Sequence, residues 1–402
     1  MSGDAKLGRF GRFGGRFVAE TLWAPLQEVA DAFELALADP AFLAQFDDLL
    51  ERRVGRPTPL TPVAKVSEKF GGARLWLKRE DLCAGASFSS NLAAAYALMA
   101  LRMGRKTLIG ESATGEFGAA LGAMGNALGL KTRIFMGRED QDSEPLGVQR
   151  MKALGVQIET VDSPMRGRKM ARAEALRFWG SLPEERFYCP SSLATPDPYP
   201  RMSAYFLSVI GAETRAQLAR SGCVPEYLVA PVGSGGFAAG LFAEFSADED
   251  MQLVGVQGAG EGLSGRHAAS VVSGRPGVFQ GVYSFLLQDD DGQVFSPASA
   301  AAGLAVANVG PQHAQWAEQG RVHYVAVEDR EAYQAVQKLL REEGLLVSLE
   351  SGHALAYAFK LLPTLEVGQD ILVGISGAGE RDLLRLEAFR AAEKAAEIGG
   401  RA

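Results

Sequence analysis

The chain of 402 residues is 47% hydrophobic and 22% charged, a balance that is typical of a globular protein with two or three domains and excludes a disordered or fibrous one. Its formal net charge of −7 disfavours nucleic-acid binding, which usually needs a basic surface, so we expect no nucleic-acid partner. The sequence has no apolar leader segment and no apolar run of about 18 residues, so we expect neither secretion nor a membrane span.

Short segments rich in β-branched residues alternate with longer helical segments along the chain. The expected strands cover residues 74–78, 107–111, 132–136, 156–161, 226–232, 253–257, 323–327 and 371–376. The expected helices cover residues 91–103, 116–127, 147–154, 166–179, 202–220, 237–245, 330–343 and 354–362. This alternation predicts an α/β fold with mostly parallel sheets in two domains, and ligands of such sheets bind beyond the carboxyl ends of the strands.

Glycines follow three of the expected strands. The segment Gly233-Ser234-Gly235-Gly236 stands between a strand and a helix, where backbone N–H groups favour an anion such as a phosphate. A tight strand-to-helix turn would explain the same glycines, and the sequence leaves both interpretations open. The three cysteines form no CxxC pair and the four histidines have no metal-ligand spacing, so we expect a reducing, cytoplasmic location and no metal site.

Motifs along the chain, in order, are GRFGGRFVAETL, GRPTPL, KREDL, RMGRK, RMKALG, DPYPRM, LESGHALAY and GISGAGERD. From about residue 11 to residue 382 the chain resembles the β subunit of tryptophan synthase, a pyridoxal-phosphate enzyme of fold type II. The resemblance implies two three-layer α/β domains. It assigns residues 1–54 and 88–206 to an N-terminal domain, with a mobile segment at about 104–190, and residues 55–87 and 207–402 to a C-terminal domain with the glycine-rich loop. It also implies a homodimer and an α-type subunit as a possible further partner.

The positions that carry the family's chemistry differ in this chain. An ungapped match after KREDL puts Ser89 where the family has its Schiff-base lysine and Phe88 where it has a phosphate-binding histidine. Because a hydroxyl cannot form an imine, we expect a protein that does not use pyridoxal phosphate and has no covalently bound cofactor. Ser143 and Ala305 replace the two partners of an ion pair that forms when the family's active site closes.

The resemblance also locates a remodelled pocket. Glu116 brings a negative charge into the loop that holds a substrate carboxylate in the family, and Glu111 matches the family's acid–base glutamate. We therefore predict Glu111 and Glu116 as the catalytic carboxylates. The expected substrate pocket combines aromatic, hydroxyl and acidic side chains: Phe88, Ser89, Phe117, Phe237, Glu350 and Ser376. Whether the three phenylalanines fill this pocket or line an open one is not decided by the sequence.

Two functions fit these residues. The first is a cofactor-independent enzyme that forms a C–C bond, alkylates or cyclises at the ring of an indole-like substrate, with Glu111 as general acid and base. The second is a noncatalytic subunit, a pseudoenzyme that binds or regulates a tryptophan synthase-type partner. Ordinary synthesis of tryptophan from serine and indole is not expected without the lysine.

Overall fold

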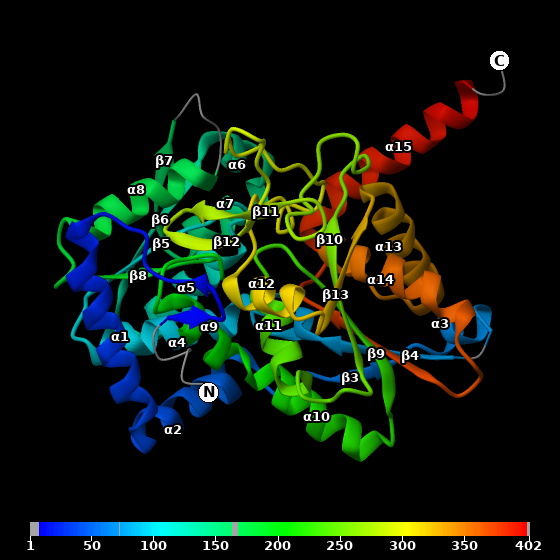
Figure 1. Cartoon of the computed structure of the whole chain (residues 1–402), viewed down its shortest axis with the longest axis horizontal. Helices are drawn as coiled ribbons and strands as arrows, with labels where there is room; N and C mark the ends of the chain where they lie inside the picture. The colour runs from blue at the N-terminus through cyan, green and yellow to red at the C-terminus, as the bar shows by residue number, and fades with distance from the viewer. Residues whose placement is uncertain (1–7, 72, 163–167, 400–402) are drawn as a thin grey trace.

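The computed structural model describes residues 8–71, 73–162 and 168–399, and the predicted helix at 166–179 begins outside these ranges. Two mostly parallel sheets lie toward opposite ends of the molecule (Figure 1). The first has the order β7 (Gln157–Val161), β6 (Lys131–Gly137), β5 (Thr107–Glu111) and β8 (Arg186–Cys189). The second has the order β13 (Val322–Val327), β10 (Gln252–Gly258), β9 (Pro225–Pro231), β14 (Asp370–Ile375), β4 (Arg74–Arg79) and β3 (Leu60–Pro62). Within these two sheets, as far as the structure describes them, only β3 runs antiparallel to its neighbour. The predicted fold class is confirmed.

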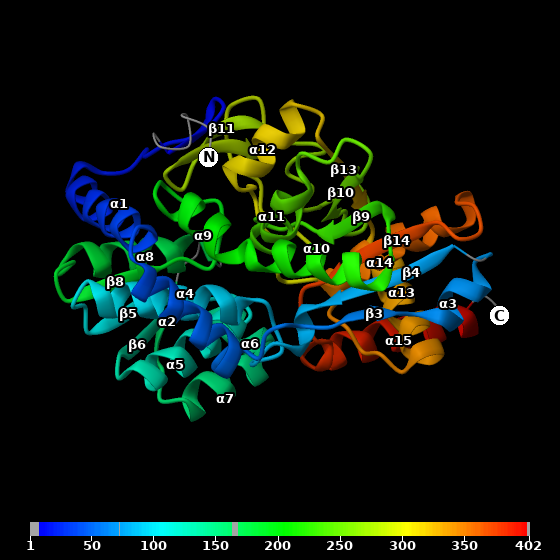
Figure 2. The same cartoon turned by 90° about the horizontal axis from the view of Figure 1, so that it is seen from below.

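Helices cover both sheets, as the crossovers between parallel strands require (Figures 1 and 2). Around the first sheet lie α4 (Ser89–Arg102), α5 (Glu116–Leu128), α6 (Arg138–Ser143), α7 (Pro145–Ala153) and α8 (Arg168–Gly180). Around the second lie α3 (Ala64–Lys69), α10 (Val209–Ser221), α11 (Gly236–Phe242), α13 (Asp329–Glu343), α14 (Leu349–Leu361) and α15 (Leu383–Gly399). The remaining helices are α1 (Trp23–Leu37), α2 (Pro40–Leu49), α9 (Tyr199–Leu207) and α12 (Pro311–Glu318). Among the helices of the described ranges, none has both the length and the apolar character that a membrane crossing needs.

A third, antiparallel sheet was not predicted. It has the order β1 (Arg9–Phe10), β2 (Phe13–Gly14), β12 (Val282–Leu286) and β11 (Arg275–Phe279). Tyr283 pairs with Gly14, so the N-terminal arm lies beside a hairpin that the sequence places in the other domain. β1 and β2 have two residues each, too few for a period-two pattern. β11 contains Pro276 and Gly277, which weaken a strand signal, and β12 has the length of a predicted strand but was missed. The division into domains stays a prediction, and residues 1–7 and 163–167 of its N-terminal part lie outside the described ranges.

Local sequence explains the elements that carry the site. Helix α4 is apolar on all sides, and its residues from Ser89 to Ala100 are buried between α5, α9 and β8. Helix α14 begins after Ser348, whose hydroxyl accepts a hydrogen bond from the Ser351 N–H. The predicted helix at 202–220 is instead two helices that meet at Ser208, whose hydroxyl donates to the Tyr205 carbonyl.

Candidate functional site

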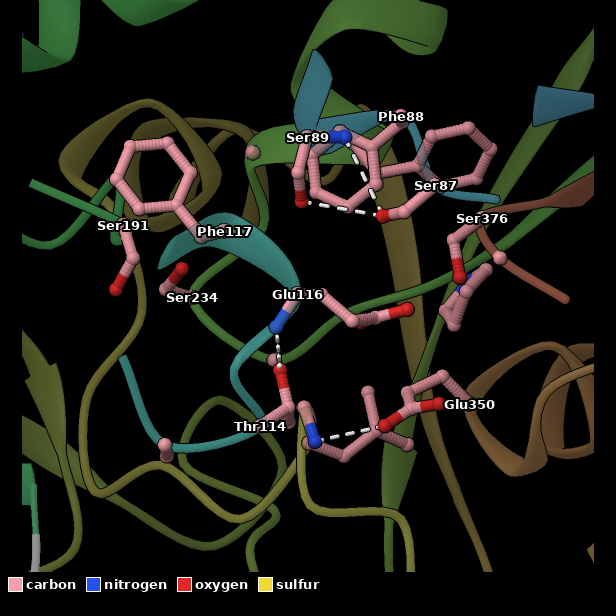
Figure 3. A pocket seen from close by; sticks show the side chains of 18 of the residues that line it. Ser87, Phe88, Ser89, Thr114, Glu116, Phe117, Ser191, Ser234, Glu350 and Ser376 are labelled. Carbon is pink, nitrogen blue, oxygen red and sulfur yellow. Dashed lines mark hydrogen bonds between the residues drawn. The ribbon is translucent and has the colours of Figure 1, made fainter. Parts of the chain in front are cut away.

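A cavity of about 120 Å³ lies between the two parallel sheets, where β5, β9 and β14 end and α4, α5, α11 and α14 begin. Figure 3 shows several of the side chains that line it. All six residues of the expected substrate pocket, the four residues of the glycine loop and Glu116 line this one cavity. The residues around it do not include Glu111. The carboxyl ends of the strands therefore bring the predicted residues together, with that one exception.

Local packing around Gly235 accounts for one glycine of the loop. Its φ is +95°, and a Cβ added there would lie 2.2 Å from the His313 ring, so another residue would be both strained and crowded. The His313 Nε2 also lies 2.8 Å from the Gly235 carbonyl oxygen. This geometry supports the tight-turn interpretation of Gly235. Binding of an anion by the loop stays a prediction.

The three phenylalanines do not form one cage. Phe88 and Phe237 face each other with ring centroids 5.5 Å apart, whereas Phe117 packs edge-on against Tyr96 at 6.4 Å. The space that they leave is smaller than the roughly 300–1,000 Å³ of most ligand sites. It is close to the roughly 150 Å³ of a cavity that holds a benzene ring. The pocket is thus narrowed by aromatic side chains and still open.

Arg381 joins two carboxylates of the cavity and was not singled out in the sequence. It lies in the 3₁₀ helix Glu380–Asp382, just beyond β14. Its Nη1 donates to Glu116 Oε2 at 2.6 Å, and its Nη2 donates to Glu350. The Glu350 carboxylate also accepts from the Gly303 N–H at 2.7 Å. The available signal was the charged triplet in GAGERD, which follows a strand that ends at the same sheet edge.

The two carboxylates ionise differently. Burial raises the pKa of Glu116 to about 7, because it outweighs the attraction of Arg381 and is reinforced by Glu350. Burial also acts against the charge of Glu350, but Arg381 and backbone N–H groups outweigh it and lower the pKa of that carboxyl to about 2. Glu116 can therefore gain or lose a proton near neutral pH while Glu350 stays ionised. A carboxyl group with this property is suited to acid–base chemistry.

Glu111 does not line the cavity. The carboxylate is fully buried and accepts hydrogen bonds from Tyr188 Oη at 2.9 Å and Arg172 Nε at 3.2 Å. Arg172 stands on α8, which packs against β5, and it also donates to the Ala194 carbonyl and to Gln280. Both oxygens of Glu111 are thus engaged on the α8 side of the sheet. The catalytic role predicted for Glu111 has no support from this placement.

Comparisons with known proteins identify relatives along most of the chain. A family described as "Pyridoxal-phosphate dependent enzyme" matches residues 52–377. The tryptophan synthase beta chain of Stenotrophomonas maltophilia (strain R551-3) is 43% identical over 378 residues, which cover 94% of this chain and 93% of the relative. That of Shouchella clausii (strain KSM-K16) is 41% identical over 382 residues, with 94% and 96% covered.

Solved structures share the fold at low identity. O-ureido-L-serine synthase superposes with a TM-score of 0.64 at 18% identity, covering 81% of this chain and 90% of that one. A fungal L-serine ammonia-lyase from Rhizomucor miehei gives 0.64 at 19% identity, with 83% and 97% covered. These similarities support the fold and nothing further.

The residues around position 89 do not fit a cofactor held as an imine. Ser89 is buried, and its hydroxyl oxygen accepts a hydrogen bond from Ser87 Oγ at 3.1 Å. None of the residues that line the cavity is a lysine. Lys78, the lysine that precedes Ser89 in the chain, is fully buried and donates to Glu213 and to the Thr58 carbonyl. The amine that an imine requires is thus not offered at this cavity.

Two expectations from the sequence are nevertheless wrong: that the protein does not use pyridoxal phosphate, and that it has no cofactor. They rested on one substituted position, whereas the match to pyridoxal-phosphate dependent enzymes extends over residues 52–377 and the relatives match 94% of the chain. A single residue does not outweigh similarity on that scale. The chain belongs to the tryptophan synthase β-chain family of pyridoxal-phosphate dependent enzymes.

Proposed function

We propose that this protein is an enzyme that binds an indole-like substrate in the cavity and forms a C–C bond at its ring, with Glu116 as the acid–base group. The observation that carries the proposal is the Glu116 carboxyl, which lines an aromatic cavity and has a pKa raised to about 7 by burial. An acid–base group works best when its pKa lies near the working pH. Relatives at 41–43% identity are named as tryptophan synthase, whose product contains an indole ring.

The side chains of the cavity have distinct roles in this proposal. The pair formed by Phe88 and Phe237 offers an aromatic surface to a flat ring. Hydroxyl groups of Ser89 and Ser376 lie on the same cavity and can bond a ring N–H. When a ring carbon adds to the β-carbon of an α,β-unsaturated acid, the C=C π bond of the acid breaks and its electrons move to the α-carbon. The proton that leaves the ring carbon passes to the ionised Glu116 carboxylate, which returns it to that α-carbon. Glu350 stays ionised and balances the charge of Arg381.

The test combines ring binding with product formation. Indole is offered with a panel of electrophiles, including L-serine and α,β-unsaturated acids, with and without added pyridoxal phosphate, and products are followed by mass spectrometry. Glu116→Gln keeps the size of the side chain and removes the base, so we expect turnover to fall by about 100-fold or more. Glu51→Gln, at an exposed glutamate, is the matched control and should keep the wild-type rate.

Equal turnover in wild type and Glu116→Gln would contradict the proposal, as would a wild-type protein that does not bind indole. Binding of indole without product from any electrophile, together with tight binding of a second polypeptide, would favour a noncatalytic subunit.

We further propose that the protein forms a homodimer and that the N-terminal arm contacts a second polypeptide. The arm and the start of α1 expose two large aromatic side chains, Phe17 at 45% and Trp23 at 51%. The Arg9 and Arg16 guanidinium groups lie over these rings and fix their orientation. The side chain of Arg16 is itself mostly buried and paired with Asp197, so the exposed rings are the feature that suits a partner surface. Light scattering at micromolar concentration should give the mass of a dimer. A monomer would contradict this proposal.

A further inference from the structure

Three elements that are distant in the sequence meet at one guanidinium group. Glu116 begins α5, Glu350 lies in the first turn of α14, and Arg381 follows β14. All three residues line the cavity. We infer that Arg381 is a positioning residue, whose guanidinium bridges Glu116 to Glu350, holds the Glu116 carboxyl at the cavity wall and sets its proton affinity. The inference rests on the acid–base role proposed for Glu116.

The geometry makes Glu350 the anchor of this bridge. The Glu350 side chain is 7% exposed, and its carboxylate is fixed from a second direction by the Gly303 N–H. The N–H groups of arginine lie in one rigid plane. When Glu350 holds one side of the Arg381 guanidinium, the direction of the N–H groups on the other side is therefore fixed. That other side meets Glu116, whose side chain is 16% exposed. Figure 3 shows the Glu116 side chain extending away from Phe117, with Ser376 and Glu350 on the other side of it.

Two carboxylates and two guanidinium groups act on Glu116. Arg381, Glu350 and Asp382 act on it from the C-terminal part of the chain, and Arg150 acts on it from α7. Arg381 is shared with Glu350, which is the more strongly ionised of the two carboxyls. Burial favours the neutral form of Glu116 and the guanidinium favours the charged form. Without Arg381 only the weaker effect of Arg150 would oppose burial, so Glu116 would stay protonated and unable to accept a proton at neutral pH.

A neighbouring arginine supplies the matched control. Arg385 stands in α15, one helical turn beyond Arg381, and its Nη2 donates to Glu144 Oε1 at 2.6 Å. Its Nη1 donates to Asp382 at 3.2 Å. Removing the charge of Arg385 therefore disturbs the same segment and a similar carboxylate while leaving the bond between Arg381 and Glu116 in place.

The test reads the protonation of Glu116 directly. The full chain is labelled with ¹³C at the glutamate carboxyl carbon, the Glu116 signal is assigned as the one missing in Glu116→Gln, and its chemical shift is followed from pH 4 to pH 10. In the wild type we expect a midpoint near neutrality. In Arg381→Gln the midpoint should rise by about one pH unit or more, because a partly buried charge partner has been lost. Arg381→Lys should give a smaller rise, and Arg385→Gln should leave the midpoint unchanged.

The outcomes separate the two proposals. A wild-type midpoint at the ordinary glutamate value would overturn the acid–base role of Glu116. A neutral wild-type midpoint that does not move in Arg381→Gln, or that moves as much in Arg385→Gln, would overturn the positioning role alone. If Arg381→Gln does not fold, the Arg381→Lys variant is measured in its place, because a lysine cannot bond both carboxylates as the arginine fork does. An unchanged Glu116 midpoint in Arg381→Lys would then reject the inference.

Discussion

Glu111 and Glu116 lie on the same strand–loop–helix segment, and each bonds to an arginine in the interior, but their surroundings differ. Among the described residues, the guanidinium that bonds Glu111 contacts no other carboxylate, since the remaining bonds of Arg172 go to the Ala194 carbonyl and to Gln280. Glu111 also accepts from Tyr188. Glu116 has one bond from Arg381, which it shares with Glu350. Glu111 therefore accepts hydrogen bonds from two side chains, whereas Glu116 accepts a side-chain hydrogen bond from one arginine that it shares with Glu350.

The largest loss of stability is expected when the ion pair between Glu111 and Arg172 is broken. Arg172→Met removes a buried guanidinium and leaves the Glu111 carboxylate, which is fully buried, without its cation. Breaking such a pair costs about 3–5 kcal/mol of the free energy of unfolding, measured by urea denaturation. The double variant Glu111→Gln/Arg172→Met should recover most of this loss. A loss of less than about 1 kcal/mol in the single variant would show that the pair does not hold the fold.

The contribution of Glu116 to the free energy of unfolding depends on pH. The folded-state pKa of Glu116 is raised to about 7 from the ordinary value of 4.5, so the folded protein binds this proton more tightly than the unfolded chain. The Glu116 proton therefore stabilises the folded state fully below pH 4.5, and this stabilisation is lost as pH rises through 7. The loss in the free energy of unfolding is about 2–3 kcal/mol. Asp382, with a pKa raised to about 6 by burial, acts in the same direction.

The contribution of Glu116 is isolated by comparison with a variant. The difference in free energy of unfolding between wild type and Glu116→Gln, measured by urea denaturation from pH 4.5 to pH 7.5, should change across this window. In the same measurement Glu51→Gln should follow the wild type at every pH. A wild-type curve that stays parallel to that of Glu116→Gln would show that the Glu116 carboxyl is not perturbed.

The smallest effect is expected at a third arginine–carboxylate pair, Arg138 with Asp162. Its geometry matches the buried pairs, with Nη2 donating to Oδ2 at 2.9 Å, but both side chains are more than half exposed. Water screens such a pair, so Asp162→Asn should leave the midpoint of thermal unfolding unchanged. A clear shift of this midpoint in Asp162→Asn would mean that pairing with an arginine stabilises the fold even at the surface. Burial would then not explain the effects expected at Glu111 and Glu116.

The sequence predicted which residues gather around one cavity better than it predicted the partners of each side chain. Glycines after the strands and the ordered motifs were enough to predict the cavity, because the carboxyl ends of parallel strands meet at one edge. The direction of Glu111 was not predictable, since it depends on Arg172 in α8 and on Tyr188 in β8. Arg381 was missed because a charged residue after a strand is usually a solvated one.

The third sheet and the family's cofactor could not be predicted from short sequence patterns. The third sheet depends on the pairing of Tyr283 with Gly14, which no local periodicity encodes. The predicted absence of a cofactor was wrong because it followed from the substitution at Ser89, whereas membership of the family follows from similarity along the whole chain. The eight predicted strands, in contrast, are all confirmed with ends shifted by no more than one residue. Most of them are buried parallel strands with a strong apolar signal, although β7 and β13 are only partly buried.

The most direct measurement is a crystal structure of the full chain with indole bound. We predict that the ring lies in the cavity, in contact with Phe88 and with the Glu116 carboxyl, while Glu111 keeps its bonds to Arg172 and Tyr188. An indole ring seated beside Glu111, with that carboxylate released from Arg172, would contradict the distinction between the two glutamates. So would a crystal at saturating indole in which the cavity lined by Glu116 holds no ring.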